Sequence, residues 1–107
     1  MGHPNKPLLQ HKFLDAVVGT NDGIWYDVSG WAGANIHISG INGDTVQVFG
    51  SNKPTVPANN AAGCQLGSDI TIDNSYLYFS GPWLWMKVKV SSAGSGTISA
   101  WAVGNPY

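Results

Sequence analysis

Apolar and polar side chains alternate in steps of two along most of the chain. In "GPWLWMKVKV", residues 81–90, the even positions from 84 onward are apolar, whereas the odd positions carry Trp83 and Trp85 and then Lys87 and Lys89. Successive side chains of a strand point to opposite faces, so this segment is predicted to be a half-buried β-strand. The face that ends in two lysines is expected to point toward water.

The same alternation predicts about eight short strands and no helix longer than one turn. "INGD", residues 41–44, and "SSAGSG", residues 91–96, are turn sequences that each predict a hairpin between the flanking strands. The predicted fold class is therefore all-β, a single antiparallel β-sandwich over residues 13–107, with either jelly-roll or immunoglobulin-like strand order. The expected strands cover residues 13–18, 24–28, 34–40, 45–51, 69–73, 76–81, 82–90 and 96–103, with a long loop at about 52–68.

The tryptophans of the last predicted hairpin raise a functional question. Across residues 91–96, Trp85 is expected opposite Trp101, and Trp83 lies on the same outward face. These rings either brace the sheet and lie under a loop, or they form a contact surface for another chain or a ligand. A covered Trp buries about 150–250 Å², so an exposed group of this kind favours a partner. Trp31, in a turn, is expected to pack in the core.

Residues 1–12, "MGHPNKPLLQHK", contain two prolines and little apolar content, which predicts an extended arm rather than a sheet strand. Twelve extended residues reach at most about 40 Å, far enough to contact a neighbouring subunit. We therefore expect Pro4, Pro7, Leu8 and Leu9 to bind another chain. The segment lacks the apolar run of a signal peptide, and no apolar run approaches about 18 residues, so neither a leader nor a membrane span is expected.

Charged residues make up only 10% of the chain, against a usual share of about 25%, and there is no Arg or Glu. A nucleic-acid-binding protein needs a basic surface and usually Arg side chains, so that class of function is not expected. Low charge combined with 43% hydrophobic residues favours a protein that works within an assembly.

No catalytic or metal-binding pattern is present in the sequence. The six aspartates mostly lie at predicted turns, where Asp caps main-chain amides. His3, His11 and His37 lack metal-ligand spacing to one another or to Cys64, which is expected to be a buried or half-buried thiol. There is also no phosphate-binding loop, nucleophile elbow or dinucleotide motif. We therefore expect no enzyme activity and no cofactor.

The segments "YDVSGWAGANIHISGINGDTVQVFGSN" and "GPWLWMKVKVSSAGSGTISAWAVG" resemble small β-sandwich virion proteins of tailed bacteriophages, including capsid decoration (cement) proteins and short tail components. The resemblance spans about residues 24–104. It implies a non-enzymatic structural protein, made in the host cytoplasm and added to the virion. It also implies a homo-oligomer, often a trimer, whose terminal arm holds the major capsid protein.

A second interpretation is a carbohydrate-binding module, or a tail or adhesin component. Trp83, Trp85 and Trp101 would then form a platform on which sugar rings stack. Such a platform requires exposed rings in one plane with polar side chains between them, whereas a protein interface would cover the rings. Lys87 and Lys89 and the N-terminal arm have no evident part in sugar recognition.

Overall fold

The computed structural model describes residues 8–106, which form eight β-strands and no helix. None of this range is therefore a helix able to cross a membrane. The strands are β1 (Leu9–Val17), β2 (Tyr26–Asp27), β3 (Trp31–Ser39), β4 (Thr45–Ser51), β5 (Cys64–Gln65), β6 (Ser75–Ser80), β7 (Trp85–Ser92) and β8 (Ile98–Pro106).

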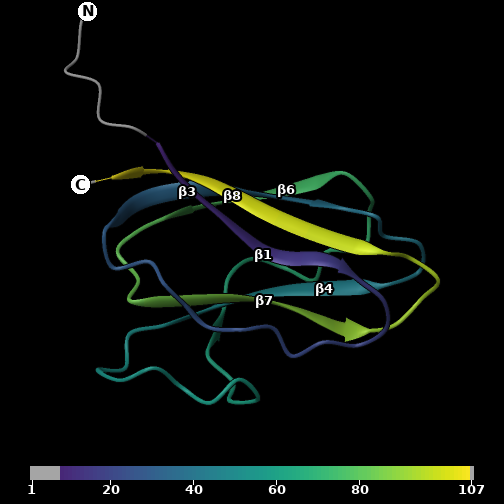
Figure 1. Ribbon diagram of the computed structural model, residues 1–107, viewed down its shortest axis with the longest axis horizontal. Helices are drawn as coiled ribbons and strands as arrows, with labels where there is room; N and C mark the ends of the chain where they lie inside the picture. The colour runs from purple at the N-terminus through teal and green to yellow at the C-terminus, as the bar shows by residue number, and fades with distance from the viewer. Residues whose placement is uncertain (1–7, 107) are drawn as a thin grey trace, which may run out of the picture.

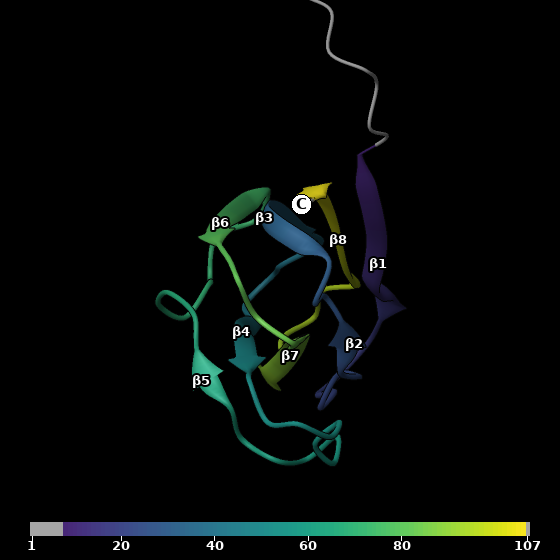
Figure 2. The same ribbon diagram turned by 90° about the vertical axis from the view of Figure 1, so that its left-hand side faces the viewer.

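The strands form two four-stranded antiparallel sheets that pack face to face (Figures 1 and 2). One sheet has the order β1-β8-β3-β6 and the other has the order β2-β7-β4-β5. The first half of the chain thus pairs with the second half in reverse: β1 with β8, β2 with β7, β3 with β6 and β4 with β5. This double wrapping is the jelly-roll order, so the sandwich prediction is confirmed and the choice of strand order is decided.

The core lies between the sheets and consists of the inward residues of alternating positions. Val46 and Val48 of β4 face Val88 and Val90 of β7 across their ladder, and all four are fully buried. Trp31 is also buried, as the sequence predicted. The opposite sheet contributes a matching set of fully or almost fully buried side chains: Ile36, Ile38, Ile98, Ala100 and Ala102.

Both predicted hairpins are wrong, although their strands and turns exist. β3 pairs with β6 and β8, and β4 pairs with β5 and β7, so residues 40–44 pass from one sheet to the other. Residues 93–97 likewise connect β7 to β8 in the opposite sheet. A period of two shows which side chains face the core, but both sheets offer an inward face, so the pattern does not identify the partner strand.

Asp44 joins the two segments that pass from one sheet to the other, residues 40–44 and 93–97, which we call the crossovers. Its carboxylate accepts hydrogen bonds from the main-chain N–H groups of Asn42, Gly94 and Gly96, at 2.9, 2.8 and 3.0 Å. The N–H of Ser95 also donates to the carbonyl of Asn42. These bonds lower the pKa of the Asp44 carboxyl, with the Asn42 amide as the largest cause. The prediction that Asp side chains cap turns is confirmed here.

The N-terminal sheet strand begins at Leu9, earlier than the predicted start at residue 13. Leu9 to Lys12, assigned to the arm by the sequence, pair with residues 101–104 of β8. His11 points between the sheets and stacks on Tyr26 of β2 with a ring distance of 3.4 Å, and burial lowers its pKa. The rest of the predicted arm, including Pro4 and Pro7, lies outside the described residues apart from Leu8.

The structure differs from two further local predictions. Residues 69–73 were expected to form a strand, but they make only an isolated bridge between Ile70 and Val46. The predicted loop instead contains the short strand β5, in which Cys64 is exposed rather than buried. Both segments lie at the edge of the sheet beyond β4, where few neighbours enforce a regular ladder.

Candidate contact surfaces

The outer face of the sheet β1-β8-β3-β6 is an exposed surface of aromatic and neutral polar side chains. Two rows of residues cross it in register from strand to strand. We call this surface the Trp101 face. One row is Lys12, Trp101, His37 and Tyr76, and the other is Gln10, Val103, Asn35 and Tyr78.

The exposure of this face comes from strand alternation. Leu77 and Phe79 of β6 point toward the core, so Tyr76 and Tyr78 must point outward, where they are 72% and 59% exposed. Sequence reasoning missed both tyrosines as site residues. The alternation in "SYLYFS" was the available signal, but it did not show that β6 would lie beside β3.

Trp101 is the largest side chain of the Trp101 face. Ala100 and Ala102 on either side of it point into the core, so its ring lies on the outer surface, half-buried. The His37 ring on β3 lies 4.8 Å from the Trp101 ring and meets it at an interplanar angle of 60°. On the other side, Lys12 pairs with Trp101 across strands, and its Nζ lies 2.8 Å from the Asp15 carboxylate.

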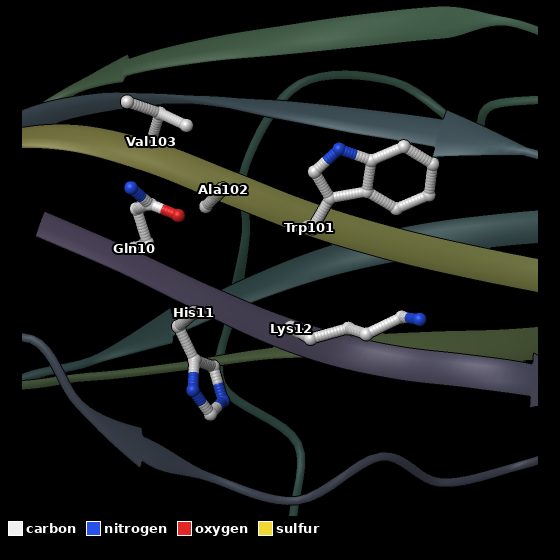
Figure 3. A pocket seen from close by; sticks show the side chains of 6 residues that line it. All are labelled: Gln10, His11, Lys12, Trp101, Ala102 and Val103. Atoms are coloured by element: carbon white, nitrogen blue, oxygen red, sulfur yellow. The ribbon is translucent and has the colours of Figure 1, made fainter.

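Two open hollows lie on this face and meet at Val103. The larger, about 440 Å³, is bounded by residues 10–12 of β1 and 101–103 of β8. In Figure 3, Gln10, Trp101 and Val103 rise from one side of these strands, and His11 projects from the other side of β1. The smaller hollow, about 210 Å³, runs from Val103 to Asn35 and Tyr78. Together they form a shallow trough across the sheet.

Trp83 and Trp85 do not share a surface with Trp101. Trp85 is the first residue of β7 and points away from the core on the outer side of the other sheet, where its Nε1 donates to the carbonyl of Lys53 at 3.0 Å. Trp83 packs against the core over Gly50, where an added Cβ would lie 2.7 Å from its ring. The three rings predicted to form one aromatic surface are therefore separated, because β7 and β8 belong to different sheets.

Trp83 and Trp85 instead lie at the end of the sandwich where the described chain begins. Figure 1 shows β1 and β7 starting, and β8 finishing, at this end. Leu9 pairs with Gly104 near the end of β8 and is half-buried, and Leu8 before it is 56% exposed. We call this the N-terminal end of the sandwich. Four of the predicted interface residues lie at this end, on two different sheets: Leu8 and Leu9 at the start of β1, and Trp83 and Trp85 at the start of β7.

Lys87 is buried, which contradicts the prediction that it faces water. It is only 1% exposed, because the loop after β4 covers it. Its Nζ donates to the main-chain carbonyls of Asn59 and Ala61, and it lies 5.0 Å from the centre of the Trp25 ring. Burial lowers its pKa. The two ion pairs within residues 8–106 do not involve Lys87.

Within the described residues, no three His, Cys or Asp side chains are grouped as a metal site would require. Two further carboxylates accept hydrogen bonds from main-chain amides in turns. Asp73 accepts hydrogen bonds from the amides of Gly40 and Ile41, and Asp27 accepts from Ser29. The Ser29 hydroxyl bond is the largest cause of the lowered pKa of Asp27.

Comparison with known proteins gives a structural neighbour but no family. No protein-family model matches the chain, and no curated protein matches it in sequence. The crystal structure of the SPBc2 prophage-derived protein YomS matches with a TM-score of 0.72 at 14% sequence identity. The match covers 92% of this chain and 94% of that protein. The two proteins therefore share the whole jelly-roll fold.

Proposed function

We propose that the chain is a non-enzymatic structural protein of a bacteriophage virion, added to the particle in the host cytoplasm. The observation that carries this proposal is the match along nearly its full length to a prophage-derived protein. The jelly roll is also an architecture of viral coat proteins, which is an argument by analogy of fold. The low charge of the chain suits a protein whose surface is covered in an assembly.

Within the virion, we propose the role of a capsid decoration protein that binds the major capsid protein as a homo-oligomer. The N-terminal end of the sandwich is the proposed attachment site. It presents Leu8 at the surface and half-buried rings at the start of β7, and the chain leads from it into residues 1–7. Pro4 and Pro7 belong to this proposed contact.

Attachment at this end would work by burying apolar area across subunit boundaries. Burial contributes about 25 cal/mol per Å², so a few hundred Å² per site yields several kcal/mol before the cost of association. An oligomer that binds several capsid subunits at once gains further from effective concentration. Modest single contacts are therefore sufficient to hold the protein on a regular lattice.

Quantitative mass spectrometry of purified particles tests this function. Particles of the phage that encodes the chain are purified, and the chain is measured relative to the major capsid protein. A ratio near one copy per capsid subunit is expected for a decoration protein. A few copies per particle would indicate that the chain is a tail component rather than a capsid decoration protein. Absence from particles, with the chain present in the lysate, would overturn the virion function.

A further inference from the structure

The Trp101 face has an arrangement that differs from an ordinary protein interface. Its two central strands carry Trp101 and Val103 on β8 and the polar Asn35 and His37 on β3. Gln10 and Lys12 of β1 lie at one margin and the tyrosines of β6 at the other. Half of the centre is therefore polar, whereas protein interfaces have an apolar centre within a polar rim. A protein or a second copy seated here would cover an amide and an imidazole at the centre of the contact, and each would require a matching partner.

We propose that the Trp101 face binds an oligosaccharide. A sugar ring has faces lined by C–H groups and an edge of hydroxyls. The C–H faces suit the electron-rich faces of Trp101, Tyr76 and Tyr78. The hydroxyls suit neutral groups that both donate and accept hydrogen bonds, such as the Asn35 amide. The alternation of rings with such groups across three strands supplies both halves of sugar recognition.

The shape of the face supports a ligand of this kind. The two hollows that meet at Val103 form a trough from Lys12 on β1 to Tyr78 on β6. The larger hollow, about 440 Å³, lies within the size range of ligand sites, about 300–1,000 Å³. Gln10, which lines it, adds a second amide beside Trp101.

Strand spacing sets the length of the ligand. Trp101 lies on β8 and Tyr76 on β6, with β3 between them, so the two strands are roughly 10 Å apart. A ligand that contacts both must be a chain of several sugars rather than a single ring. The two rows of the Trp101 face contain no carboxylate, so neutral and acidic chains are both compatible with its charge.

This site borders the attachment site proposed above, because Leu8 also lines the smaller hollow, but the tryptophans of the two sites lie on different sheets. Trp101 lies on the outer face of one sheet, and Trp85 lies on the outer side of the other. A protein attached through Leu8 and the start of β7 would leave Trp101 and the larger hollow available to bind polysaccharide. Sugar binding is measured on the isolated protein, so its failure and the failure of the virion function are separate results.

Isothermal titration calorimetry with four probes tests the proposal: cellohexaose, maltohexaose, chitohexaose and soluble bacterial cell-wall polysaccharide. The wild-type protein is expected to bind at least one. Trp101→Ala and, separately, the exposed Tyr78→Ala are expected to weaken that binding at least tenfold. Ile24→Ala, which removes an exposed apolar side chain outside the face, is the matched control and is expected to bind as wild type. Thermal unfolding of each variant shows that it is folded.

Three results would overturn the proposal. The first is no binding to any of the four probes. The second is binding that survives both aromatic substitutions, or that Ile24→Ala weakens equally. The third is a wild-type oligomer that Tyr78→Ala converts to monomer in sedimentation, because a second copy would then occupy the face. If Trp101→Ala does not fold, Tyr78→Ala and Asn35→Ala decide the matter, since both side chains are exposed.

Discussion

Single polar residues fix the connections between the two sheets. Asp44 is almost completely buried, and its partners are main-chain amides of both crossovers. Each of these amides would otherwise need another acceptor. Its carboxylate therefore specifies where the chain changes sheets, a role that no alternation pattern describes.

Replacing Asp44 by Asn is expected to lower the melting temperature at pH 7 by about 5–15 °C, because the amide retains only one acceptor oxygen. The pKa of Asp44 is lowered in the fold, so its charged form stabilises the protein above pH ~4. That contribution disappears as the pH falls through the lowered pKa. The difference between wild type and variant should therefore shrink as the pH falls below about 4, as measured by calorimetry.

Asp69→Asn is the matched control for this substitution. Asp69 is exposed, and among residues 8–106 its carboxylate accepts from the side chains of Gln47 and Gln65, at 2.9 and 2.7 Å. Replacing the Asp69 carboxylate by an amide is expected to change the melting temperature little. An equal effect of the two substitutions would show that Asp44 has no special structural role.

Lys87 is expected to hold the loop after β4 against its sheet. Lys87→Met keeps a long apolar chain over Trp25 but leaves the carbonyls of Asn59 and Ala61 without their donor, a cost of about 1–3 kcal/mol. Hydrogen exchange should become faster in residues 52–63, and chemical denaturation should report the lower stability. Lys89→Met, at a half-buried position in the same strand, is the control. Unchanged stability in Lys87→Met would show that Lys87 does not hold the loop after β4 against its sheet.

At the scale of elements, strand identity follows from local pattern, whereas strand partnership follows from the path of the chain. The alternation in residues 81–90 is visible in the sequence, and β7 forms over Trp85–Ser92 with Met86, Val88 and Val90 inside, whereas Leu84 precedes the strand and is exposed. Its partners β2 and β4 are far from it in sequence. The turn sequences resembled hairpin turns, since a tight reversal between sheets needs the same glycine-rich chemistry. Gly40, at φ 93°, would bring a Cβ within 1.7 Å of the Thr97 carbonyl oxygen.

The position of β1 makes a prediction about N-terminal truncation. Deletion of residues 1–7 leaves β1 complete and is expected to weaken attachment to particles without lowering the melting temperature. Deletion of residues 1–12 also removes the Leu9–Lys12 ladder with β8 and the His11–Tyr26 stack, so it should lower stability as well. Co-sedimentation with particles and thermal unfolding measure the two effects. If the protein that lacks residues 1–7 attaches as well as the wild type, these residues are not part of the contact.

At the scale of the whole molecule, the proposed homo-oligomer is expected to depend on the N-terminal end of the sandwich. Light scattering should give a discrete oligomer for the wild type, and Trp85→Ala should shift it toward monomer. Val18→Ala is the control, since Val18 is 74% exposed and follows β1 at the opposite end. A monomeric wild type, or an oligomer that Trp85→Ala leaves intact, would place Trp85 outside the subunit contact.

The sequence by itself determined the all-β class, most strand positions, most inward residues of the core and the capping role of several aspartates. These features depend on side-chain period and turn chemistry, which act over a few residues. Only the tertiary structure decided the jelly-roll order, the burial of Lys87 and the grouping of Trp101 with tyrosines of β6 rather than with Trp85. Those outcomes depend on which of two equally apolar sheet faces each crossover reaches, a choice made by packing between residues far apart in the chain.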